Sequence, residues 1–209
     1  MPTGSATKPL REGSAEKRAA ILSAAQELFL TVGFDRTSVD AVAASAGVSK
    51  RTVYDYFGDK RSLVLAVVDS VAQTLLVDLR AAIADHLVDV DDLEAALIAF
   101  SSRVATSTLG SSDYAALMRL TAHKGLGFDV RGHLLSRAPE ELLIERFDEF
   151  VRRGLLEERD TSLAVDHFIA MTLLPVAEHL RVLAADDPVA SQHKINEGVR
   201  AFLRAYAPR

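Results

Sequence analysis

The sequence contains no cysteine, and this absence excludes several kinds of site at once. A disulfide framework, a thiolate zinc site and a cysteine nucleophile all need cysteine. The lack of disulfides fits a reducing compartment, so we expect a cytoplasmic protein. Residues 1–13 lack the apolar segment of a signal peptide and predict a flexible, mildly basic tail.

Long apolar runs and enzyme motifs are missing as well. The longest apolar runs are interrupted well before the roughly 18 residues that a membrane span needs, so we expect no contact with a membrane. There is no glycine-rich phosphate loop, no HExxH or GxSxG motif and no paired-carboxylate signature. We therefore expect a protein that is not an enzyme and that holds no cofactor and no metal.

Basic residues are slightly fewer than acidic ones, 24 against 29, and the charges are unevenly distributed along the chain. The net charge is −5, which at first argues against a nucleic-acid partner. Residues 1–60 hold 8 basic and 7 acidic residues, whereas the rest of the chain holds 16 basic and 22 acidic residues. The N-terminal third is thus neutral to basic, and this asymmetry permits DNA binding at one end of the chain.

What the sequence does contain is a succession of helical patterns, with no clean strand alternation. Apolar residues at helical spacing form one stripe over 21–32, and Gly33 suits the end of that helix. Ser38 and Ser49 can each cap a short helix with a hydroxyl group. Gly47 separates these two helices, which together occupy residues 38–57.

Six further helices are predicted, at about 63–83, 92–104, 113–124, 139–153, 161–184 and 188–206. The prediction is an all-α fold of about nine helices. Residues 14–60 would form an N-terminal three-helix domain with a helix-turn-helix. Residues 61–209 would form a larger helical domain.

The segment 38–57 has the composition of a helix-turn-helix. Ala43 is small where the two helices would cross, and Gly47 allows the tight turn between them. An ordinary helical hairpin would need the same scaffold. The outward face favours DNA binding, because hydrogen-bond donors cluster there on a short helix. These donors are Ser49, Lys50, Arg51, Thr52, Tyr54 and Tyr56.

The stretch from Ile21 to about Leu65 resembles the N-terminal domain of the tetracycline-repressor (TetR) family. The matching motifs are A-x-x-L-F at 25–29, G-F-x-x-T-S-V at 33–39, A-G-V-S-K at 46–50, T-V-Y-x-Y-F at 52–57 and D-K-x-S-L at 59–63. They cover about a fifth of the chain, and their combination is highly specific. The resemblance implies a homodimeric transcriptional repressor that binds double-stranded DNA. It also implies a variable C-terminal domain that binds a small-molecule effector.

The resemblance also assigns roles to residues of this chain. Thr37 would contact phosphate, and Tyr54, Tyr56 and Lys60 would hold the DNA backbone. The complete DNA-binding set is Thr37, Ser38, Ser49, Lys50, Arg51, Thr52, Tyr54, Tyr56 and Lys60. Arg51 departs from the glycine common in relatives, and its guanidinium could pair with guanine or rest on a phosphate. Asp55 would point away from DNA or orient a basic neighbour.

The C-terminal helices suggest a dimer. Residues 168–177 are apolar nearly all round the helix, so they must be buried on opposite sides. One interpretation places this helix in a four-helix interface between two subunits. The alternative is a central helix of a monomeric core. The expected interface residues are Phe168, Thr172, Val176, Ile195, Val199 and Phe202.

A ligand pocket is predicted from polar or polarisable residues that interrupt apolar faces. The candidates are Phe100, Arg103, Met118, His123, Phe147, His167 and Met171. For single members the structural alternatives are stronger. His167 could be an ordinary buried histidine with a hydrogen-bond partner, and Met171 could fill a gap in the core.

The resulting hypothesis is a ligand-responsive transcriptional regulator, most simply a repressor that binds a palindromic operator as a homodimer. One alternative is an all-helical enzyme or a small-molecule-binding protein without operator function. Another is a non-specific architectural protein, but the acidic pI of about 5.7 argues against it.

Overall fold

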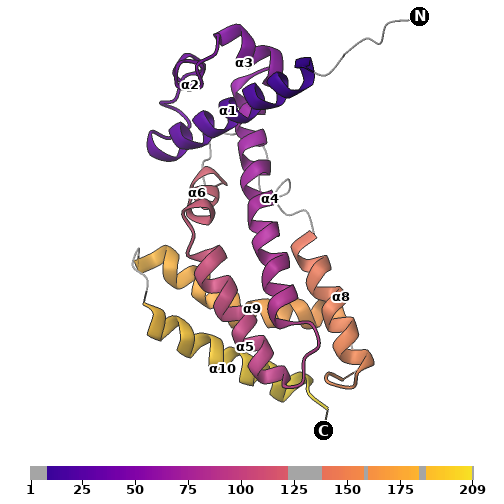
Figure 1. The fold of residues 1–209 in the computed structure, drawn as a ribbon. Coiled ribbons are helices and arrows are strands. Elements are labelled where there is room, and N and C mark those ends of the chain that lie inside the picture. Colours follow the sequence, from indigo (N-terminus) through magenta and orange to yellow (C-terminus); the bar gives the residue numbers. More distant parts are fainter. Residues whose placement is uncertain (1–8, 122–137, 158–159, 184–186, 209) are drawn as a thin grey trace, which may run out of the picture. The chain divides into compact units, whose positions relative to one another are not determined.

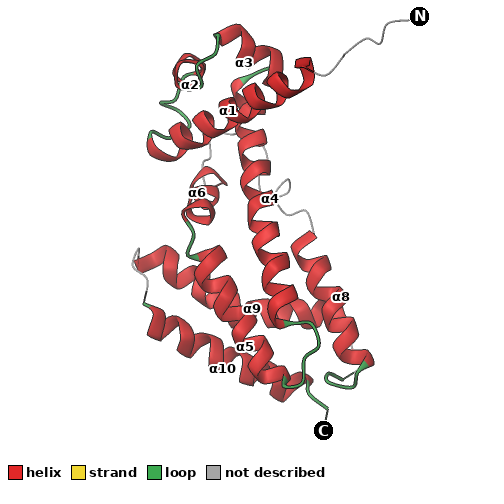
Figure 2. Ribbon diagram, in the orientation of Figure 1, coloured by secondary structure: helices red, strands yellow, loops and turns green. Residues whose placement is uncertain are grey.

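The computed structural model describes residues 9–121, 138–157, 160–183 and 187–208. Over these ranges the chain forms helices and no strand, which confirms the all-α prediction (Figure 2). The helices can be followed in Figure 1. They are α1 (Pro9–Thr31), α2 (Val39–Ser45), α3 (Lys50–Phe57), α4 (Lys60–His86), α5 (Leu93–Val104), η1 (Ala105–Leu109), α6 (Ser112–Thr121), α8 (Ala138–Arg152), α9 (Thr161–Leu183) and α10 (Pro188–Tyr206).

The chain divides into two compact units. The N-terminal unit comprises Met1–Val71 with Ala116–Leu134, and the C-terminal unit comprises Ala72–Ala115 with Leu135–Arg209. The division falls within α4, so this helix contributes residues to both units. The sequence predicts an earlier boundary, at residue 60.

Glycines and hydroxyl caps shape the N-terminal unit as the sequence predicted. Gly33, Gly47 and Gly58 all have a positive φ, at 93°, 66° and 78°. Ser38 caps α2 by accepting a hydrogen bond from the Ala41 amide, and Ser49 caps α3 in the same way through the Thr52 amide. α1 begins at Pro9, inside the segment that the sequence assigned to a tail.

An aromatic cluster forms the centre of the C-terminal unit. The Phe168 ring of α9 lies 5.4 Å from Phe147 of α8 and 5.5 Å from Phe202 of α10. Phe202 in turn stacks on Tyr206 at 4.7 Å. Phe100 of α5 and the three clustered phenylalanines above are fully buried, so α5, α8, α9 and α10 share one core.

A π-helical turn, η1, continues α5 and was not predicted. The hydroxyl groups of Thr106 and Ser107 both donate to carbonyl oxygens one turn back, including that of Arg103. Such side chains compete with backbone amides for the same acceptors, and π-turns often occur at functional positions.

The predicted dimer residues are buried within a single chain, which corrects that assignment. Each is at most 1% exposed, so none has surface to offer a partner: Phe168, Thr172, Val176, Ile195, Val199 and Phe202. The alternative interpretation of a central core helix fits instead. α9 is apolar on several sides because α5, α8 and α10 of its own chain cover it.

Two helices are long and apolar enough to cross a membrane by length and composition alone, namely Lys60–His86 and Thr161–Leu180. Both also place side chains in the protein core. Leu63 of α4 is fully buried, as is Phe168 of α9. A core helix passes the same test as a membrane span, and this burial is what a core helix requires.

Candidate functional site

Helix α3 is fixed at its N-terminus by a compact hydrogen-bond arrangement. The Ser49 hydroxyl accepts from the Thr52 amide at 3.1 Å and lies 2.8 Å from the Thr52 hydroxyl. Val53 and Phe57 are buried beneath the helix. Because these two positions face inward, helical spacing turns Lys50, Arg51 and Tyr54 outward, and all three are exposed.

Lys50 joins α3 to α2. Its ammonium group lies 2.9 Å from the Asp40 carboxylate, and this hydrogen bond raises the pKa of Lys50. The ion pair points the Lys50 side chain towards α2, although both partners are largely exposed and can separate at small cost. Sequence reasoning missed Asp40, whose only signal was an acidic residue in the first turn of a helix, a position that the helix dipole favours by itself.

Arg51 is the most accessible cation of the helix, with a side chain that is 90% exposed. Its nearest ionic partner is Asp55, one turn later on α3, at 3.9 Å. A pair this exposed contributes little to stability, so the guanidinium can exchange Asp55 for another acceptor at small cost. Asp55 accordingly lies beside a basic neighbour, one of the two roles expected for it.

Tyr56 and Lys60 lie where α3 passes into α4. The Tyr56 hydroxyl donates to the Ser14 hydroxyl of α1 at 2.9 Å, and the Lys60 ammonium lies 4.2 Å from the centre of the Phe34 ring. Asp59 accepts from the Ser62 amide at 2.7 Å at the start of α4, and this contact lowers the pKa of the carboxyl group. Tyr56 thus has a packing role besides any contact with DNA.

Thr37 is not available as a phosphate ligand, which corrects the role carried over from the resemblance. Its side chain is 3% exposed. Its hydroxyl donates to the carbonyl oxygens of Gly33, at 2.7 Å, and Leu28, at 3.2 Å. Thr37 therefore stabilises the turn between α1 and α2. Ser38 beside it is exposed and caps α2.

The described members of the predicted ligand set lie in different surroundings. Phe100 and Phe147 are fully buried in the aromatic cluster, so no open face remains beside them. His167 is half-buried and shares a 2.6 Å hydrogen bond with the Tyr206 hydroxyl, so it has the partner that the structural alternative gave it but is not fully buried. Three others are exposed at the surface: Arg103, Met118 and Met171. Of these, Met118 belongs to the N-terminal unit. His123 lies outside the described residues.

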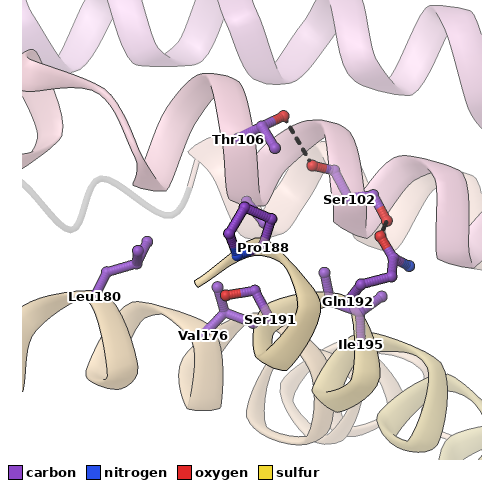
Figure 3. A pocket seen from close by; sticks show the side chains of 9 residues that line it. Ser102, Thr106, Val176, Leu180, Pro188, Ser191, Gln192 and Ile195 are labelled. Carbon is purple, nitrogen blue, oxygen red and sulfur yellow. Dashed lines mark hydrogen bonds between the residues drawn. The ribbon is translucent and has the colours of Figure 1, made fainter. Parts of the chain in front are cut away.

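A different pocket, of about 110 Å³, lies in the C-terminal unit between α5 with η1, α9 and α10 (Figure 3). Its lining residues are Ser102, Ala105, Thr106, Val176, Leu180, Pro188, Ser191, Gln192 and Ile195. Sequence reasoning missed it. The available signal was a set of polar residues, such as Ser191 and Gln192, near the buried face of the last helix.

Among the residues that the structure describes, no three histidine, aspartate or glutamate side chains gather closely enough to hold a metal ion. The chemistry of the N-terminal unit is instead that of hydrogen-bond donors and cations on a short, capped helix.

Comparison with known proteins gives matches over both units. The family described as "Bacterial regulatory proteins, tetR family" matches residues 21–67. The family described as "AefR-like transcriptional repressor, C-terminal domain" matches residues 95–208, more than half of the chain.

Individual proteins agree with these matches. The HTH-type transcriptional activator FasR of Mycolicibacterium smegmatis is 33% identical over 99 residues, which are 47% of this chain and 45% of FasR. The chain thus spans less than half the length of this curated relative.

Two solved structures match over nearly their whole length. A TetR-family transcriptional regulator from Mesorhizobium loti MAFF303099 has a TM-score of 0.82 at 26% identity, covering 93% of this chain and 98% of the other. The flavonoid-responsive regulator FrrA has a TM-score of 0.73 at 28% identity, covering 93% and 99%.

Proposed function

The chain belongs to the TetR family of transcriptional regulators, and from that premise we propose that it binds a palindromic operator as a homodimer and leaves it when a small molecule binds. The members of this family are regulators of transcription and not enzymes. We assign DNA binding to residues 14–60, regulation and dimerisation to residues 61–209, and place the protein in the cytoplasm, where its DNA target lies.

One observation carries the DNA-binding part of the proposal. The cap at Ser49 and the buried Val53 and Phe57 hold α3 so that Lys50, Arg51 and Tyr54 point outward together. A recognition helix places its N-terminal side chains on base edges, while neighbouring groups bind phosphates. Lys50 and Arg51 occupy the first turn of α3, and Arg51 is the residue that we expect to bind guanine.

The outer side of α9 supports a second copy as the partner. Leu163, Met171 and Leu174 are 47%, 36% and 59% exposed, and their spacing puts them on one side of the helix. Exposed large apolar side chains in a row are typical of an interaction surface. These three residues replace the buried set that the sequence suggested, and a two-fold axis would bring the two stripes together.

The effector part of the proposal depends on coupling between two sites. α4 contributes residues to both units, so a ligand that favours one conformation of the C-terminal unit can change how the two recognition helices are spaced. Half-sites on DNA lie about 34–36 Å apart, so a shift of a few ångströms costs contacts on both. Ligand and operator then oppose each other by the same coupling free energy. The related protein FrrA is named as a flavonoid-responsive regulator.

A footprint on DNA selected from random sequence tests operator binding. We expect protection of two half-sites related by a palindrome, and loss of protection in the double variant Lys50→Ala, Arg51→Ala. Uniform coverage of the DNA would contradict the proposal and indicate an architectural protein. Measuring transcription from the selected site, with and without the protein, then distinguishes repression from activation. Activation is the role named for the relative FasR.

The dimer interface is tested by Leu174→Glu. Sedimentation should show a folded monomer, because the carboxylate would be buried against the second subunit without a partner. Val189→Glu is the matched control, since Val189 is exposed but lies on α10. A dimer that persists in Leu174→Glu contradicts this interface.

A further inference from the structure

The pocket of the C-terminal unit originates in the way α9 and α10 cross. The two helices run antiparallel, since Met171 faces Gly198 and His167 faces Tyr206, and at Gly198 an added β-carbon would overlap the Met171 carbonyl oxygen. The pair is therefore in backbone contact at this crossing. Further along, towards Leu180 and Pro188, a space of about 110 Å³ opens, and α5 with η1 forms its third wall (Figure 3).

A hydroxyl group without a partner lies in this pocket. Ser191 is 7% exposed, and its Oγ has no hydrogen-bond partner among the described residues. A buried polar group without a hydrogen-bond partner is unfavourable, so such groups normally find a protein, water or ligand partner. Because Ser191 lines the pocket, whatever occupies the pocket can supply that partner.

The neighbouring polar groups are already held in place. The Ser102 hydroxyl lies 3.0 Å from the Gln192 side-chain oxygen, and the Gln192 amide donates to Asn196 at 2.8 Å. These bonds leave the Gln192 amide with one further donor hydrogen. Ser191 and Gln192 are thus two adjacent polar groups with hydrogen-bonding capacity to spare on one wall.

The remaining lining decides the chemical class of the ligand. None of the described residues that line the pocket carries a charge, so among them an ionic head group would find no counter-ion. Val176, Leu180 and Ile195 offer an apolar wall to a short alkyl chain. A cavity of about 150 Å³ holds benzene, so this smaller pocket fits a molecule of about five heavy atoms.

We propose that this pocket is the effector site and that its ligand is a short, neutral molecule with one hydroxyl or carbonyl group, which hydrogen-bonds to Ser191. The inference rests on the proposed effector control and names its site. The pocket occupies the inner side of α9, through Val176 and Leu180, whereas Leu163 and Leu174 mark the outer stripe of the same helix. A ligand that moves α9 away from α10 therefore alters the proposed dimer surface directly.

The first experiment uses 1-butanol as the probe and methyl NMR on the full-length protein. We expect saturable shifts at the methyl groups of Val176, Leu180 and Ile195, and no such shifts with butyrate, whose carboxylate finds no counter-ion. Ser191→Ala should weaken 1-butanol binding about tenfold, because one hydrogen bond is lost.

Ser101→Ala is the matched control. Ser101 is also a buried serine whose Oγ has no partner among the described residues, but it does not line the pocket. Equal 1-butanol affinity in the two variants would mean that the Ser191 hydroxyl does not bind the ligand, and an absence of saturable shifts would mean that the pocket holds solvent only; either result would overturn the proposal. The control also separates ligand loss from a change in folding, because both variants remove one orphaned hydroxyl.

The second experiment measures operator affinity with and without 1-butanol. We expect 1-butanol to lower the affinity of the unmodified protein and of Ser101→Ala, and to have at least severalfold less effect on Ser191→Ala. Binding of 1-butanol without a change in operator affinity would overturn the effector role. A palindromic footprint together with no methyl shifts would remove this pocket and leave the proposed operator binding intact, whereas no footprint at all would count against the proposed function.

Discussion

The two units of the chain are built on opposite principles. In the N-terminal unit the residues proposed to bind DNA are mostly exposed. They lie on short helices whose ends are fixed by caps at Ser38 and Ser49 and by a turn at Gly47. In the C-terminal unit the residues that organise the fold are buried. Phe147, Phe168 and their aromatic neighbours join four helices into one core.

This difference explains why the exposed residues can be replaced to test DNA binding without unfolding the protein, whereas replacing the buried residues lowers its stability. An exposed cation such as Arg51 can be removed with little effect on folding, because its ion pair with Asp55 is exposed. A ring such as Phe168 cannot be removed without leaving a cavity. The variants that follow separate loss of DNA binding from loss of stability, and they begin with the largest expected effect.

Phe168→Ala should lower the free energy of unfolding by about 3–5 kcal/mol, because it empties the centre of the aromatic cluster. Urea unfolding followed by circular dichroism measures this change. Val189→Ala, at an exposed site on α10 outside the proposed dimer stripe, is the control and should affect the stability of the chain far less. If Phe168→Ala instead yielded a stable, well-folded monomer, Phe168 would belong to an interface and not to the core.

Gly198→Ala should destabilise the C-terminal unit by about 3 kcal/mol, since the new methyl group would overlap the Met171 carbonyl oxygen. Helix propensity alone predicts the opposite sign, a gain of about 0.5–1 kcal/mol. Ala205→Gly, at an exposed site on the same helix, measures that propensity term. Thermal unfolding that shows Gly198→Ala to be more stable would contradict the close crossing of α9 and α10.

Arg51→Ala should cost about 1–3 kcal/mol in the discrimination of one base pair, because a guanidinium can bind both acceptors of guanine. The measurement compares the selected operator with versions altered at single positions. Binding to unrelated DNA should change much less. An equal loss of affinity on every sequence would mean that Arg51 contacts a phosphate, the other role open to it. The control is Arg204→Ala in the C-terminal unit, which should change neither the discrimination between base pairs nor the binding to unrelated DNA.

Lys60→Ala should reduce the salt dependence of operator binding by about one unit of slope per subunit, as expected for one lost phosphate contact. Its ammonium group lies over the Phe34 ring, 4.2 Å from the ring centre, which holds it at the start of α4. Titrations over a range of salt concentrations give the slope. Lys60→Arg keeps the charge and should keep the slope; an unchanged slope in Lys60→Ala would remove Lys60 from the interface.

The sequence by itself determined the order of the helices and the design of the N-terminal unit. Caps and turn glycines act over three or four residues, so Ser38, Gly47 and Ser49 could be assigned from local chemistry alone. The same local rules predicted which side of α3 faces outward. They could not show that Thr37 turns its hydroxyl back to Gly33 and Leu28, because that depends on how the turn after α1 closes.

Only the tertiary structure decided what covers each apolar face. An all-round apolar helix can be buried by its own chain or by a second copy, and the hydrophobic effect is the same in both cases. The fold assigned Phe168, Val199 and Phe202 to the core and left Leu163 and Leu174 outside. It also opened the pocket beside Ser191, because the spacing of α9 and α10 follows from their contact at Gly198, which no local pattern encodes.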